Sequence, residues 1–505
     1  MALITFGLGS FGYITYLALM GESSTKKNVI ILFTRYPIPR KTKTRLIPTL
    51  GTTAAANTQL LMTNHMLDIL GKFLKWKEDC QLVVQYHGGT KQQMAYWLGR
   101  KTMFEKTLTF REQEGSNLGE RLSNAAHTQF EQGAQNILII GSDIPGIDEA
   151  VLEKAFSCLE QGERMVLGRA ADGGYYCIGF RKEVFSKTED IFKNVDWGSG
   201  EVYQQQVKQS ESLGIKVRTL PTVLTDVDNF VDLKVFEKEA GVRLSALTGF
   251  RWSIVIPVLN EAASISHTLC RVLQSQRESK NNKVIEIIVC DGGSHDDTIK
   301  KVEEFAKYST VPVNIIHSQP GRGFQLYNAT AHASGDYLLF LHGDTLLPKN
   351  FNESAAELLV VPGIVAGAFH FELDALKPPK CHMISWFFKL KLRILVWLTN
   401  WRCYNAELPY GDQALFMSRR SFDAVGGWDK VYLMEDYILV KKLHTLGHVG
   451  LVPGESVVTS ARRWEKNEVY KVTALNSLIC LAYNMGISPN TLARWYYGRQ
   501  LKTSG

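Results

Sequence analysis

The 505-residue chain lacks the features that define several protein classes. Its eight cysteines are scattered, with no C-x-x-C pair and no histidine at zinc-ligand spacing, which excludes a structural zinc module. Strong charge is also missing, because Lys+Arg 57 against Asp+Glu 50 leaves a net charge of only +7. A nucleic-acid binder would cluster far more positive charge. The small excess suits phosphate-bearing small molecules or an anionic membrane surface, and unpaired thiols are typical of cytoplasmic proteins.

Charge is absent altogether from Met1–Gly21. This stretch is long enough to cross a bilayer, lacks the basic start and cleavage site of a secretory signal, and is followed by Lys26 and Lys27. A span there would leave the rest of the chain on the cytoplasmic side. The alternatives are an extension without fixed structure and a helix packed on a domain surface. We therefore expect a cytoplasmic protein and leave open whether residues 1–21 anchor it to the inner face of a membrane.

Short apolar runs alternate with helical patterns along both halves of the chain, which predicts an α/β fold with mainly parallel central sheets. The expected strands are Val29–Phe33, Leu82–Val84, Ile137–Ile140, Met165–Leu167, Trp252–Pro257, Ile285–Cys290 and Tyr337–Leu341. The expected helices include Thr53–Lys75, Leu118–Gln132 and Ala262–Gln276. The pattern restarts near Ser245–Phe250 without a Pro- or Gly/Ser-rich linker. We therefore expect an anchor or extension at 1–25 and two domains, at 28–245 and 250–505.

An aspartate follows an apolar strand in each half: Asp143 in ILIIGSDIP and Asp344 in YLLFLHGDTLLP. Ligands of open parallel sheets bind at the carboxyl ends of the strands, where a carboxylate can hold a divalent cation on a diphosphate. Either aspartate alone could simply cap the next turn or helix. The repetition of the arrangement favours two nucleotide sites.

Seven segments of the second half carry a resemblance to a known family: IVIPVLNEAASI, IIVCDGGSHDDT, GRGFQLYNATAHASGDYLLFLHGDT, PYGDQALF, GGWD, MEDY and SARRW. In this order they resemble the inverting family 2 glycosyltransferases, which have the GT-A fold of nucleotide-diphospho-sugar transferases. Within that family the chain is most similar to glycosyltransferases associated with arsenosugar biosynthesis. The resemblance implies transfer of a sugar from a nucleotide-sugar donor to a small-molecule or lipid hydroxyl, with inversion.

The resemblance also implies which residues bind the donor. Asn260 and Glu261 follow the first strand and would contact the base and ribose of the nucleotide. Asp291 would be the nucleotide-recognition carboxylate, although an ordinary Asp-Gly turn is the alternative. Arg322, between two glycines, would bind diphosphate oxygens through paired hydrogen bonds, unless it is only an exposed loop residue.

The D-x-D metal motif of the family is replaced here by His342-Gly343-Asp344. Asp344 can still ligate Mn²⁺ or Mg²⁺ together with diphosphate oxygens of the substrate. His342 is either a second ligand or a wall of the site. The replacement leaves the identity of the metal and the full ligand set open.

Catalysis requires a base near the acceptor hydroxyl. By resemblance that base is Asp436, with Glu435 orienting it or replacing it, although acidic pairs also favour helix starts. The residues expected to line the acceptor and donor-sugar pocket are Gly411, Asp412, Gln413, Arg463 and Trp464.

SARRW is similar to the Q-x-x-R-W motif of processive relatives, but Ser460 replaces the glutamine, which favours a single transfer. Nearby, Met383–Trp401 is apolar with three cations. It is either an interfacial membrane element or part of the packing between domains.

Residues 28–240 resemble nucleotidyltransferase-like proteins related to 2-phospholactate guanylyltransferase, on FTRYPIPRKTKTRL, EGSNLGERL, GSDIP, LGRAADGGYYCIGF, DWGSGEV and LTDVDNFVDL. The cations of the first loop would neutralise substrate phosphates. These are Arg40, Lys41, Lys43 and Arg45. By resemblance Asp143 and Asp228 form a metal pair, with Asp226 as a substitute, and Asp172 contacts the substrate.

Three functions remain open. The first is a glycosyltransferase fused to a domain that makes the activated donor, transfers a second sugar or serves as an idle scaffold. The second has nucleotidyl transfer as its main activity, with the second half binding the acceptor. The third is a membrane-docked nucleotide-sugar sensor without turnover.

Overall fold

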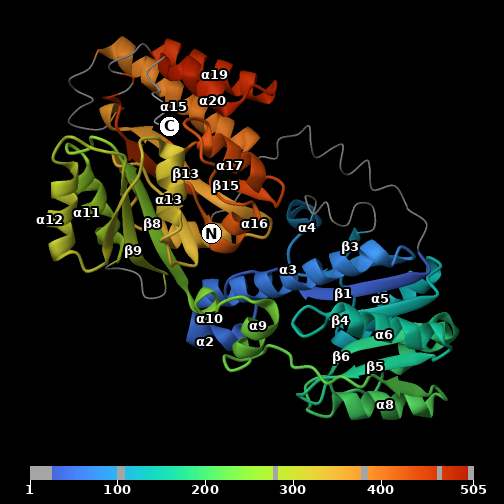
Figure 1. Cartoon of the computed structure of the whole chain (residues 1–505). Helices are drawn as coiled ribbons and strands as arrows, with labels where there is room; N and C mark the ends of the chain where they lie inside the picture. The colour runs from blue at the N-terminus through green and yellow to red at the C-terminus, as the bar shows by residue number, and fades with distance from the viewer. Residues whose placement is uncertain are drawn as a thin grey trace. The chain divides into compact units, whose positions relative to one another are not determined.

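The computed structural model describes residues 26–98, 108–276, 282–376, 385–462, 464 and 469–498 (Figure 1). They separate into two compact units that divide between Thr248 and Gly249. The expected anchor at residues 1–21 lies outside the described residues, and so does Arg463. Within the described ranges, no helix combines the length and the apolar character needed to cross a membrane.

The first unit is built on a seven-stranded sheet, counted over the described residues, with the order β3-β2-β1-β4-β6-β5-β7. The strands are β1 (Asn28–Arg35), β2 (Cys80–His87), β3 (Leu108–Glu112), β4 (Asn136–Gly141), β5 (Met165–Arg169), β6 (Tyr175–Arg181) and β7 (Val217–Thr219). The α-helices are α2 (Ile47–Leu50), α3 (Thr52–Trp76), α4 (Lys91–Leu98), α5 (Leu118–Glu131), α6 (Glu149–Glu160), α7 (Thr188–Ile191), α8 (Val202–Ser212), α9 (Leu233–Ala240) and α10 (Leu244–Thr248). The 3₁₀ turns are η1 (Thr44–Leu46) and η3 (Lys182–Lys187).

Both faces of β1 are covered, which explains its unbroken apolar sequence. Ile30 and Leu32 pack in a core with residues of α3 and α6, whereas Val29 and Ile31 pack in a second core with residues of α5. Because successive side chains of a strand point to opposite faces, one run of hydrophobic residues serves two layers of helices.

The second unit has an eight-stranded sheet, again over the described residues, with the order β10-β9-β8-β11-β14-β13-β15-β12. The strands are β8 (Phe250–Val258), β9 (Asn282–Asp291), β10 (Val313–His317), β11 (Tyr337–Phe340), β12 (Thr345–Leu346), β13 (Ile364–Leu373), β14 (Phe416–Ser418) and β15 (His448–Thr459). The α-helices are α11 (Ile265–Gln276), α12 (Thr298–Tyr308), α13 (Arg322–Thr330), α14 (Phe351–Leu359), α15 (Trp386–Ala406), α16 (Arg419–Ala424), α17 (Glu435–Leu443), α19 (Val469–Asn484) and α20 (Pro489–Tyr497). The 3₁₀ turns are η4 (Asp374–Leu376) and η6 (Gly411–Gln413).

The two sheets share one topology. If the two-residue β12 is set aside, both have the chain order 3-2-1-4-6-5-7. In both, the sixth strand is antiparallel to its neighbours, and the other pairs are parallel. The predicted fold class, two α/β units with mainly parallel central sheets, is confirmed. Because the first and fourth strands are parallel neighbours, their carboxyl ends open onto the same edge in each unit.

Candidate functional site

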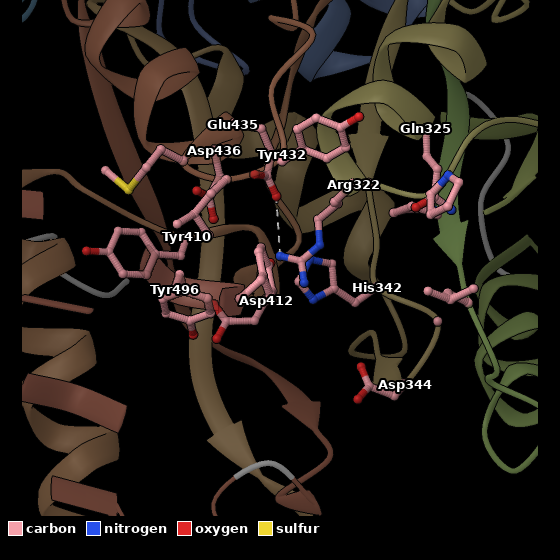
Figure 2. Close-up of a pocket in the computed structure, with 18 of the residues that line it drawn as sticks. Arg322, Gln325, His342, Asp344, Tyr410, Asp412, Tyr432, Glu435, Asp436 and Tyr496 are labelled. Atoms are coloured by element: carbon pink, nitrogen blue, oxygen red, sulfur yellow. Dashed lines mark ion pairs between the residues drawn. The ribbon is translucent and has the colours of Figure 1, made fainter. Parts of the chain in front are cut away.

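The second unit has a cavity of about 750 Å³ at the carboxyl ends of β8 and β11 (Figure 2). Helix α13 contributes Arg322, helix α17 contributes Glu435 and Asp436, and α19 and α20 form a further wall. The lining includes Pro257, Val258, Glu261, Arg322, Gln325, His342, Asp344, Tyr410, Asp412, Glu435, Asp436, Trp464, Ile479, Cys480, Tyr496 and Tyr497. Most of the residues predicted for the second site are therefore brought to one cavity.

An ion pair joins the first residues of α13 and α17. Nη1 of Arg322 lies 3.5 Å from Oε1 of Glu435, a contact drawn as a dashed line in Figure 2. The Glu435 side chain is 5% exposed and that of Arg322 is 45% exposed. Burial raises the pKa of Glu435 to about 7, against the opposing effect of Arg322. Burial lowers the pKa of Arg322, but Glu435 and Asp436 more than offset this, so the guanidinium stays charged.

Backbone amides hold the carboxylate of Asp436. Gly411 N–H donates to Oδ2 at 2.8 Å, and Tyr437 N–H donates to Oδ1 at 2.7 Å. A Cβ on Gly411 would lie 2.9 Å from Nε2 of His342 and 3.5 Å from Oδ2 of Asp436. The absence of a side chain at Gly411 thus lets the imidazole and the carboxylate both lie close to the backbone there.

His342 and Asp344 face different partners. Figure 2 shows the His342 ring beside the Arg322 guanidinium, with the Asp344 carboxylate pointing away from it. Burial, and then the charge of Arg322, lower the pKa of His342 well below its ordinary value, so the imidazole is neutral. Asp344 instead accepts a hydrogen bond of 3.1 Å from Arg462, which also donates to Glu261 at 2.6 Å. Two carboxylates therefore share one guanidinium at the edge of the cavity.

Two of the predicted nucleotide contacts, Asn260 and Asp291, are not among the residues that line the cavity. Asp291 is 4% exposed, and its carboxylate accepts hydrogen bonds from the backbone N–H groups of Gly293 at 3.1 Å and Ser294 at 3.0 Å. Asn260, at φ +56°, accepts from His295 N–H at 2.9 Å. Both side chains close the turns after β8 and β9, which agrees with the turn alternative for Asp291.

Of the residues predicted to bind the acceptor and the donor sugar, some line the cavity and others do not. Asp412 and Trp464 line the cavity, and Gly411 lies behind it against His342. Gln413 does not reach the cavity, because its side chain is fully buried and donates to the carbonyl of Phe369 at 3.0 Å. It holds η6 in place instead of facing a ligand.

Among the residues that the sequence did not predict, two make hydrogen bonds that organise this site. Arg462, next to the predicted Arg463, is the arginine that binds Asp344. Gln325 lies one turn after Arg322 on α13 and donates to the carbonyls of Val258 at 2.9 Å and Cys290 at 2.7 Å, which ties the ends of β8 and β9 together. The three-residue spacing from Arg322 placed Gln325 on the same face of a helix and was the available signal.

The first unit has a cavity of about 770 Å³ at the equivalent edge of its sheet. Its lining includes Arg35, Lys43, Arg45, Gln113, Arg121, Ser142, Asp143, Asp172, Tyr175, Trp197 and Asp228. The predicted phosphate-binding residues Arg40 and Lys41 are not part of this lining.

A lysine lies between the two carboxylates predicted as a metal pair. Nζ of Lys43 is 3.2 Å from Oδ2 of Asp143, 3.2 Å from Oδ1 of Asp228 and 2.6 Å from the carbonyl of Val227. The Lys43 side chain is 9% exposed, and Arg45 adds a contact of 2.7 Å to Asp228. With this ammonium in place, the pair does not fit a divalent cation, because the cation would meet a like charge and oxygens already bound.

The charged groups of this cluster change one another's pKa values. Burial lowers the pKa of Lys43, but Asp143 and Asp228 raise it further, so the net change is upward. Burial raises the pKa of Asp143, which Lys43 more than offsets, so this pKa is lowered. Burial, and then Asp172, Asp228 and Asp143, raise the pKa of Asp226 to about 6. Asp172 accepts from Gly174 N–H at 2.9 Å.

Two family models match the chain in these two units. Residues 253–423 match "Glycosyl transferase family 2", and residues 73–199 match "Uncharacterized protein conserved in bacteria (DUF2064)". The chain therefore joins a family 2 glycosyl transferase domain to a domain of this second family. The predicted resemblance of the second half to family 2 glycosyltransferases is confirmed.

Curated relatives agree with the match to glycosyl transferase family 2. The chain is 34% identical over 112 residues to glucosyl-3-phosphoglycerate synthase of Mycobacterium tuberculosis, which covers 21% of this chain and 32% of the relative. It is 27% identical over 234 residues to the probable glycosyltransferase YdaM of Bacillus subtilis, which covers 44% of this chain and 52% of the relative. The matches thus span about a third of the first relative and about half of the second.

Among solved structures, a Desulfovibrio desulfuricans G20 protein described as a nucleotide-diphospho-sugar transferase is 33% identical to this chain. The match covers 42% of this chain and 87% of that one, with a TM-score of 0.37. A mannosyltransferase of Pyrobaculum calidifontis, solved with GDP-Man and Mn²⁺, is 17% identical to this chain. The match covers 49% of this chain and 68% of that one, with a TM-score of 0.34.

The raised pKa of Glu435 predicts a pH-dependent stability. Between an ordinary pKa of 4.5 and about 7, the folded protein binds a proton that the unfolded chain releases. The contribution of this group to the free energy of unfolding therefore falls as the pH rises through that interval. In denaturant titrations, the free energy of unfolding of the wild type minus that of Glu435→Gln should decrease from about pH 5 to about pH 8. Glu303→Gln on exposed α12 is the matched control, and a pH-independent difference for Glu435→Gln would contradict the assignment.

The Lys43 bridge predicts a gain of cation binding. Lys43→Met leaves Asp143 and Asp228 without their shared ammonium, so the variant should unfold at lower denaturant concentration and bind Mn²⁺ that the wild type does not bind. Electron paramagnetic resonance counts the bound Mn²⁺ per chain. Lys43→Met/Asp143→Asn should return that number to the wild-type value. Equal Mn²⁺ binding by the wild type and Lys43→Met would show that the lysine does not occupy a cation position.

Proposed function

We propose that the second unit transfers a sugar from a nucleotide-sugar donor to a hydroxyl group of a small-molecule or lipid acceptor, with inversion at the sugar carbon. The observation that carries the proposal is the convergence of Arg322, Asp344 and Asp436 on one cavity at the carboxyl edge of the sheet. A cavity of this size accommodates a ligand of nucleotide-sugar dimensions. The match to glycosyl transferase family 2 supports the reaction class.

Asp436 is the base in this proposal. Its carboxylate is fixed by two backbone amides at the start of α17, so it can accept the proton of an acceptor hydroxyl without first being oriented. Glu435 is not the base in this proposal, because its carboxyl group is buried against Arg322. Glu435 positions Arg322 instead, and the exposed part of the guanidinium binds the diphosphate that leaves the sugar.

Asp344 would hold a divalent cation, Mn²⁺ or Mg²⁺, together with Glu261. Their carboxylates share one guanidinium, that of Arg462, whose side chain is 40% exposed and can move into water, so a divalent cation could take its place. When bound, such a cation supplies charge neutralisation for the diphosphate. His342, held neutral beside Arg322, is a wall of the site in this arrangement.

For the first unit we propose the binding of a phosphate-bearing ligand. Three arginines that line its cavity, Arg35, Arg45 and Arg121, supply positive charge, and Lys43 neutralises the carboxylates that would otherwise repel an anion. The observation that favours this over metal-dependent nucleotidyl transfer is the position of Lys43 between Asp143 and Asp228.

The proposal for the second unit predicts loss of turnover on removal of single carboxylates. With Mn²⁺ or Mg²⁺ and a panel of UDP- and GDP-sugars, Asp436→Asn and Asp344→Asn should each lower the release of nucleoside diphosphate by about 10²–10⁴-fold. Asp423→Asn, on the exposed surface of α16, is the control and should keep full activity. Full activity of Asp436→Asn and Asp344→Asn would refute the site, and tight nucleotide binding without turnover by the wild type would favour a sensor.

A further inference from the structure

Helices α15, α19 and α20 lie together at one end of the second unit, at the top of Figure 1. One side of α15 is packed, because Leu392 and Leu395 share a core with Phe371 and Leu373 of β13. The opposite side is exposed and apolar. Phe387 is 73% exposed, Trp386 65%, Trp397 62% and Trp401 55%.

The exposed residues follow the period of a helix. At 3.6 residues per turn, Trp386, Ile394, Trp397 and Trp401 fall on one side of α15. Lys391 and Arg393, both exposed, fall at the two edges of that side. An aromatic stripe bordered by cations is the layout of a helix that lies in a membrane interface.

Helix α19 continues this surface. Tyr470, Leu478 and Leu481 are exposed at helical spacing on α19, which packs against α15. We call these three residues, together with Trp386, Phe387, Trp397 and Trp401 of α15, the aromatic face.

Within the described ranges of α15, α19 and α20, the charged side chains all have one sign. Helices α15, α19 and α20 contain no aspartate or glutamate, and four of their cations are exposed: Lys391, Arg393, Lys471 and Arg494. A docking surface for another protein would balance or deplete these charges, whereas anionic lipid headgroups complement them. Tryptophan is also the residue that favours the boundary between headgroups and acyl chains.

We infer that the aromatic face docks the second unit on an anionic lipid surface. Two of the three helices also reach the cavity, because Ile479 and Cys480 of α19 and Tyr496 and Tyr497 of α20 are part of its lining. Helix α19 therefore contributes both to the aromatic face and to the wall of the cavity. A face that binds lipid on its outer side and walls the cavity on its inner side selects an amphiphilic acceptor held in the bilayer. This last step rests on the proposed sugar transfer, whereas docking itself does not.

Docking is tested by binding to vesicles without any donor or acceptor. The full chain is centrifuged with vesicles of phosphatidylcholine alone and of phosphatidylcholine with phosphatidylglycerol. The wild type should bind the anionic vesicles more tightly, and salt should weaken the binding. Trp397→Ser/Trp401→Ser should weaken it about tenfold or more, because two buried indoles are lost from the interface. Tyr308→Ser, at an 85% exposed position on α12, is the matched control and should bind as the wild type does.

A second readout separates the aromatic face from residues 1–21. Brominated phosphatidylcholine quenches tryptophans that enter the interface, so quenching should be strong in the wild type and weak in Trp397→Ser/Trp401→Ser. Equal quenching of both proteins, or no binding of the wild type to anionic vesicles, would overturn the inference. Self-association of the wild type that the double substitution abolishes, without vesicle binding, would assign the face to a second copy of the chain. Failure of sugar transfer with intact vesicle binding would refute only the proposed function.

Discussion

A carboxylate placed just beyond a buried strand needs a neutralising charge, and both units meet this requirement with a basic side chain. In the first unit Lys43 pairs with Asp143, and in the second Arg462 pairs with Asp344. The two aspartates follow the fourth strand of sheets with the same topology, at the edge where the first and fourth strands end together. The cavities, their charges and the ligands they can accept all depend on this pairing.

The two pairs differ in how readily a ligand could exchange with them. The side chain of Lys43 is 9% exposed, and its ammonium group has three oxygen partners. Moving this ammonium away would break all three contacts, which costs free energy. The side chain of Arg462 is 40% exposed and can move into water while keeping its hydration. A divalent cation is therefore far easier to accommodate beside Asp344 than beside Asp143. Two units of one topology thus differ in their chemistry through the burial of one cation.

The sequence was sufficient for the fold and for the region of each site, because buried parallel strands have unbroken apolar runs and their carboxyl ends share an edge. Val29–Phe33 and Trp252–Pro257 lie in β1 and β8, and Asp143 and Asp344 lie at the cavities. Side-chain direction could not be predicted. The sequence singled out Arg463, which lies outside the described residues, and gave no sign that Arg462 would donate to Asp344. Likewise, Gln413 turns inward to Phe369 although its neighbour Asp412 lines the cavity.

The adjacent carboxylates of Glu435 and Asp436 illustrate how one turn of helix can separate two tasks. Both lie in the first turn of α17, where the helix dipole favours negative charge. Glu435 is buried, and its carboxyl group lies 3.5 Å from Nη1 of Arg322, which positions the guanidinium. Asp436 is held by amides from two different segments and faces the cavity. If the two were exchanged, the buried position would hold a side chain one methylene shorter, which would not reach Arg322 at the present 3.5 Å. The order Glu-Asp, and not only the presence of two acids, is therefore what the geometry of this site requires.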